Sequence, residues 1–135
     1  MRHQNFFATL FCASNLTVSA QQVNPPLEEV ARCFFIYAAI TEVGRDLQKP
    51  QLFQFGQSRS SWAGGFLQAN QDNPQFKKVF ESNLQANKQL GIRILDALPQ
   101  IIRTKDIGRF TAILNQAAAC DRTVGIRTAG FPPIE

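Results

Sequence analysis

Histidine is nearly absent from this chain of 135 residues. The one histidine is His3, and the one methionine is Met1. Histidine is the commonest general base and a frequent metal ligand, so its absence after residue 3 removes Ser-His and Cys-His nucleophilic sites and His-ligated haem. We therefore expect no catalytic residues, no metal site and no cofactor.

The motifs of phosphate and redox sites are missing as well. Residues 63–66 contain two glycines but lack the lysine and the spacing of a P-loop, and no Cys-x-x-Cys pair is present. Carboxylates remain: Glu42 and Asp46 lie one helical turn apart. We expect these two to face solvent or to pair with Arg45, because like charges at that spacing repel each other. An enzyme that works with carboxylates alone is the least favoured function.

Charged residues are few, at 18% of the chain, and the formal net charge is only +4. The basic residues are scattered, apart from the neighbours Lys77 and Lys78. Proteins that bind nucleic acids gather such residues on one face, so we expect no specific nucleic-acid binding. A membrane-spanning helix needs about 20 apolar residues in succession, and we expect no membrane span in the mature chain.

The N-terminal sequence has the pattern of an export signal. Arg2 and His3 supply a short positive start, residues 6–13 are apolar, and residues 18–20 are small enough to precede a cleavage site. We predict that residues 1–20 are a signal peptide and that the remainder is periplasmic or secreted. The alternative is an amphipathic or irregular N-terminus on a cytosolic protein, because polar residues soon interrupt the apolar stretch.

Cleavage after Ala20 would leave two of the three cysteines, Cys33 and Cys120. Cysteines of an exported protein are usually paired, because the compartment is oxidising. We predict a disulfide between them, which would close most of the mature chain and stabilise it by about 4 kcal/mol in the chain-entropy description. The alternative is a pair of buried free thiols that act as small apolar side chains.

The segment around which the chain is organised is residues 25–46, which we predict to form a central helix. Asn24 is a suitable N-cap, and Pro25 and Pro26 suit the first turn. No residue from 33 to 40 is charged, so this helix is apolar nearly all round at its middle. That pattern is typical of a helix in the centre of a bundle.

Residues 51–71 allow two interpretations. One is a single long helix, in which the small glycines let a neighbouring helix approach closely. The other is a polar loop followed by a short helix over residues 62–70, since Gly64 and Gly65 each cost about 1 kcal/mol inside a helix. We favour the single helix, because its apolar stripe keeps its register across the polar residues.

Two further helices are predicted in the second half of the chain. Asn73 followed by Pro74 is a strong start signal for a helix to about residue 98, where Pro99 would stop or kink it. One more turn over residues 100–103 is left open. Thr104 is positioned to cap a last helix that ends near residue 122.

Four helical segments with short connections predict an all-α fold. We expect a small antiparallel bundle of about four helices, with one disulfide between the first and the last helix. Residues 21–123 would form this bundle. Residues 124–135 contain two glycines and the adjacent prolines 132 and 133, so we predict an extended C-terminal tail.

The function expected from these features is binding. We predict an exported helical interaction protein without catalytic activity, such as an envelope accessory factor or an inhibitor, with a protein partner in the cell envelope. The alternative is a carrier that holds a small apolar ligand in a cavity lined by phenylalanine, of which the chain has twelve. The predicted partner-binding residues are Phe53, Phe55, Arg59, Trp62, Phe131 and Ile134.

Overall fold

The computed structural model describes residues 25–135, so the predicted signal peptide and the Asn24 cap lie outside the described residues. The helices are α2 (Leu27–Asp46), α3 (Pro50–Ala69), α4 (Pro74–Arg103) and α5 (Ile107–Val124). This described part contains no strand, so the predicted all-α fold is confirmed. None of its helices combines the length and the apolar character that crossing a bilayer requires.

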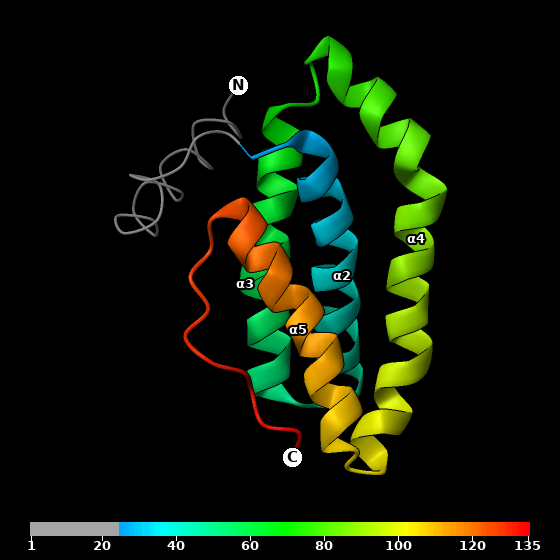
Figure 1. The fold of residues 1–135 in the computed structure, drawn as a ribbon, viewed down its shortest axis with the longest axis vertical. Helices are drawn as coiled ribbons and strands as arrows, with labels where there is room; N and C mark the ends of the chain where they lie inside the picture. Colours follow the sequence, from blue (N-terminus) through cyan, green and yellow to red (C-terminus); the bar gives the residue numbers. More distant parts are fainter. Residues whose placement is uncertain (1–24) are drawn as a thin grey trace.

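The bundle is arranged around α2. This helix contacts α3, α4 and α5, and α3 and α4 flank it on opposite sides, each antiparallel to the helix that precedes it (Figure 1). Ile36, Tyr37 and Ile40 in the middle of α2 are fully buried, because other helices cover the segment that has no charged residue. The prediction of a central helix is confirmed.

A disulfide joins this central helix to the last one. Cys33 in the middle of α2 pairs with Cys120 near the end of α5, with 5.6 Å between the two Cα atoms. Both side chains are fully buried. The predicted disulfide between the first and last helices is therefore confirmed.

α3 is one continuous helix, so the alternative of a loop and a short helix is wrong. Close packing against α2 explains how a segment rich in glycine and serine stays helical. A Cβ atom on Gly56 would lie 2.5 Å from Oγ1 of Thr41, and one on Gly44 would lie 2.5 Å from the backbone nitrogen of Phe53. The two glycines let the helix backbones approach closely, and the resulting burial compensates for their weak helix propensity.

Pro99 does not end α4, which continues for another turn to Arg103. Ile101 and Ile102 in this last turn are buried, so packing holds the turn in place although proline removes one backbone hydrogen bond. The additional turn that the sequence left open is present.

Two predicted helix starts are shifted. α2 begins after Pro26, which occupies the N-cap position and makes no side-chain cap bond, so this proline is outside the first turn. The cap of α5 is Asp106, whose carboxylate accepts a hydrogen bond from the backbone N–H of Arg109 at 3.2 Å. Thr104 instead ends α4 and donates its hydroxyl proton to the carbonyl of Gln100. The prediction that Thr104 caps the last helix is wrong.

Candidate functional site

Three of the six predicted partner-binding residues meet where the C-terminal tail contacts α3. The guanidinium carbon of Arg59 lies 3.7 Å from the centre of the Phe55 ring. Phe131 of the tail meets the same ring edge-on, with 6.3 Å between the ring centres. Phe55 is buried and the Arg59 side chain is 11% exposed, so both help to hold the protein's own tail, while Phe131 keeps 37% of its surface exposed.

The other three predicted residues are half-buried. Trp62 stacks on Phe66 with 5.6 Å between ring centres, and Ile134 of the tail packs against the hydrophobic core. Phe53 lies in the first turns of α3, where its backbone is close to Gly44. Partner contact through these six residues stays a prediction, and several of them also have a role inside the fold.

Asp121 of α5 is a buried carboxylate that the sequence interpretation missed. Its side chain has no exposed surface. Arg59 of α3 donates three hydrogen bonds of 2.9 to 3.0 Å to its two oxygens. The hydroxyl of Tyr37 on α2 donates a fourth at 2.7 Å, and the hydroxyl of Thr128 in the tail donates a fifth at 2.5 Å. One carboxylate therefore links three helices and the tail.

This network provides the buried Asp121 carboxylate with a counter-charge and hydrogen-bond donors. An unpaired carboxylate in the core would cost several kcal/mol, and here a bidentate guanidinium and two hydroxyls offset that cost. Burial raises the pKa of Tyr37 well above its ordinary value, and the neighbouring Asp121 carboxylate raises it further. Tyr37 consequently stays protonated and remains a hydrogen-bond donor. These contacts identify the cluster as a structural ion pair beside the disulfide.

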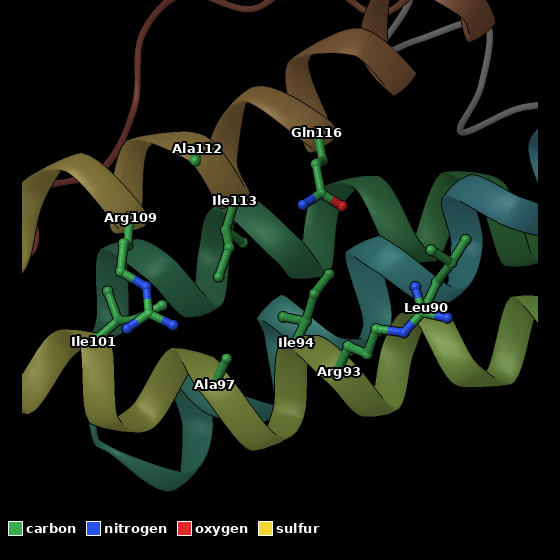
Figure 2. Close-up of a pocket in the computed structure, with 9 residues that line it drawn as sticks. All are labelled: Leu90, Arg93, Ile94, Ala97, Ile101, Arg109, Ala112, Ile113 and Gln116. Atoms are coloured by element: carbon green, nitrogen blue, oxygen red, sulfur yellow. The ribbon is translucent and has the colours of Figure 1, made fainter.

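A groove runs between α4 and α5 on another side of the molecule (Figure 2). It has a volume of about 270 Å³ and is open to solvent. Its lining combines aliphatic side chains with three polar ones: Leu90, Ile94, Ala97, Ile101, Ala112 and Ile113, together with Arg93, Arg109 and Gln116.

The two arginines of the groove are exposed and have no partner in the described part of the chain. No hydrogen bond or ion pair there engages the guanidinium of Arg93 or of Arg109. Figure 2 shows Arg109 reaching from α5 toward α4, whereas Arg93 extends along α4 toward Leu90. None of the nine lining residues is acidic. The groove thus presents two cations beside an apolar floor and is the candidate binding site.

The groove differs from the cavity that the carrier hypothesis predicts. No phenylalanine lines it. Several phenylalanines pack on one another between α2 and α4 instead, as in the stacked pair Phe76 and Phe80 and the contact of Phe80 with Phe35. Nowhere in residues 25–135 do three or more histidine, cysteine or acidic side chains gather in a way that could hold a metal ion.

Comparison with known proteins adds no assignment. No protein-family model matches the chain, and neither a curated protein nor a solved structure matches it. A functional proposal for this chain therefore depends on the geometry of its surface, above all on the groove between α4 and α5.

Proposed function

We propose that this chain is an exported, non-catalytic binding protein and that its protein partner docks in the α4–α5 groove. The observation that carries the proposal is the pair of guanidinium groups, on Arg93 and Arg109, that have no partner within residues 25–135 and lie beside an aliphatic floor. Arginine is enriched in protein interfaces, because its planar fork binds carboxylates with two hydrogen bonds. Burying the floor under a partner would supply the apolar contribution to binding.

The floor is well suited to a stable interface because its side chains are packed against the hydrophobic core. Ile94 and Ile101 of α4 and Ile113 of α5 are buried residues whose outer atoms line the groove. Their positions are fixed by packing against the core, so little side-chain freedom would be lost when a partner covers them. An apolar strip bordered by exposed cations is the usual composition of a binding surface, with a dry centre and a polar rim.

Export is part of the proposal, and the disulfide supports it. Structural disulfides persist in the periplasm and outside the cell, where the environment is oxidising, and are rare in the cytosol. A buried bond between Cys33 and Cys120 fits that setting. The signal-like pattern of residues 1–20 supports the same compartment.

Capture from an envelope extract tests the proposal. The protein is expressed with its own N-terminus, recovered with the disulfide formed and immobilised. We expect it to retain a protein that the Arg93→Glu/Arg109→Glu variant does not retain. The matched control is Lys77→Glu/Lys88→Glu, which makes the same change of charge at exposed positions of α4 that do not line the groove. Equal capture by all three proteins, or equal loss in both variants, would contradict docking in the groove.

A further inference from the structure

We infer that the α4–α5 groove binds an acidic amphipathic helix of the partner, which places apolar side chains on the floor and a carboxylate near each of Arg93 and Arg109. This inference rests on the proposed function and specifies the partner's chemistry. Three properties of the groove lead to it: the length of its floor, its charge and its openness.

The length of the floor suits a helix of about three turns. The residues that α4 contributes follow one another at intervals of four, three and four positions: Leu90, Ile94, Ala97 and Ile101. At about 1.5 Å per residue this stripe is roughly 16 Å long, or about three helical turns. A helix that lies in such a groove anchors itself with apolar side chains at positions i, i+3 or i+4, and i+7. The stripe of α4 would meet a stripe of the same period.

The charge of the groove selects the sign of the occupant. Both charged side chains of the lining are arginines, and Gln116 adds a neutral amide. In Figure 2, Arg109 is drawn beside Ile101 and Arg93 beside Leu90, so the cations lie toward opposite ends of the apolar stripe. A helix with a glutamate or aspartate near each end of its apolar stripe would pair with both. A basic helix would instead meet two like charges.

The openness of the groove favours a helix over a single-chain lipid. An acyl chain with a carboxylate head would satisfy one arginine and cover part of the floor, but its outer side would remain in water because the groove is open. An amphipathic helix has a polar face for that outer side. Because the groove is open to solvent, a ligand with one apolar and one polar face fits it better than a ligand that is apolar all round.

The inference is tested with two synthetic amphipathic helices that share one leucine stripe. One carries glutamate on both flanks of the stripe and the other carries lysine. Each is titrated into the processed, disulfide-bonded protein that the capture experiment uses, and binding is followed by calorimetry and by the backbone amide signals of Ile94, Ile101 and Ile113. We expect binding of the glutamate helix, with shifts at these three residues, and much weaker binding of the lysine helix.

Variants make the test specific for the two arginines. Arg93→Glu/Arg109→Glu should weaken binding of the glutamate helix about tenfold or more and improve binding of the lysine helix. Lys77→Glu/Lys88→Glu should leave both affinities within about twofold, since these lysines lie outside the groove. Reversal of preference in the first variant alone is the expected result. Equal binding of both helices, or equal effects of both double variants, would overturn the inference.

The remaining alternative is that the groove binds a fatty acid instead of a helix. Dodecanoate is titrated under the same conditions, and shifts at the floor residues with dodecanoate but with neither helix would overturn the helical partner in favour of an amphiphile. Different results would reject the acidic helix and the proposed binding function. If envelope capture depends on the groove while the glutamate helix does not bind, the binding function stands and the acidic helix is rejected.

Discussion

Helix α5 borders two regions that treat arginine in opposite ways. Toward α2 and α3, Asp121 holds Arg59 with three short hydrogen bonds, and that side chain is 11% exposed. Toward α4, Arg93 and Arg109 are exposed and have no partner within residues 25–135. The difference teaches that residue type does not determine the role of a charge. An arginine that pairs with a carboxylate of its own chain stabilises the fold. An exposed arginine that has no such pair can bind a carboxylate of another molecule.

The largest effect should come from removing the disulfide that joins α5 to α2. We expect Cys33→Ala/Cys120→Ala to lower the free energy of unfolding by about 4 kcal/mol, because the crosslink spans most of the folded chain. Denaturant unfolding of this variant and of the reduced wild type measures the loss. A loss under about 1 kcal/mol would contradict the assigned role of the disulfide.

The second effect concerns the buried carboxylate. Asp121→Asn should lower the free energy of unfolding by about 3 kcal/mol, because it leaves the guanidinium of Arg59 without its counter-charge in the core. Asp96→Asn is the matched control at an exposed position of α4 and should change stability by no more than about 0.5 kcal/mol. Similar losses in both variants would mean that the packing of α5 against α2 and α3 does not depend on the ion pair of Asp121 and Arg59.

The third effect separates tight from loose packing. Gly56→Ala should lower the free energy of unfolding by about 2 kcal/mol, because the new methyl group would clash with the backbone of Thr41 and push α2 and α3 apart. Gly108→Ala at the exposed start of α5 meets no atom closer than 3.8 Å and should stabilise the helix slightly. Thermal unfolding of the two variants gives the comparison, and a stabilised Gly56→Ala would contradict the close approach.

The smallest effect is a pH dependence. Because burial raises the pKa of Tyr37, the unfolded chain loses the tyrosine proton at a lower pH than the folded chain does. Stability from this group is fully present below about pH 10, and above it should fall by up to about 1.4 kcal/mol per pH unit. Tyr37 is the one tyrosine of the chain, so near-ultraviolet absorbance of tyrosinate reports on it directly. Ionisation of the folded protein at the ordinary pKa would refute the buried hydrogen bond.

The sequence predicted those parts of the molecule that depend on local pattern and composition. The uncharged stretch from residue 33 to 40 indicated the central helix, and the two cysteines that remain after the predicted signal peptide indicated the disulfide. The choice between Thr104 and Asp106 as the cap of α5 was not predictable, because both are good caps. The backbone at Lys105, with a φ of 54°, decides between them.

The two arginine environments were beyond sequence reasoning for a different reason. The donors to Asp121 lie 62 and 84 positions away at Arg59 and Tyr37, so no local spacing connects them. One signal was present: Asp121 follows Ala117 by one helical turn, which places it on the buried face of α5. The groove has no such signal, because only the placement of α4 beside α5 shows that Arg93 and Arg109 find no partner among the described residues.

The most direct test of this division between the arginines compares the denaturant midpoint of Arg93→Gln/Arg109→Gln with that of the wild type. Each protein is measured with and without the synthetic glutamate helix. A ligand that binds only the folded protein raises the midpoint, and at a fixed ligand concentration the increase grows with the logarithm of its affinity. We predict equal midpoints without the helix and an increase with it for the wild type alone. A lower midpoint for the free variant, or the same increase in both proteins, would contradict the assignment of these arginines to a partner.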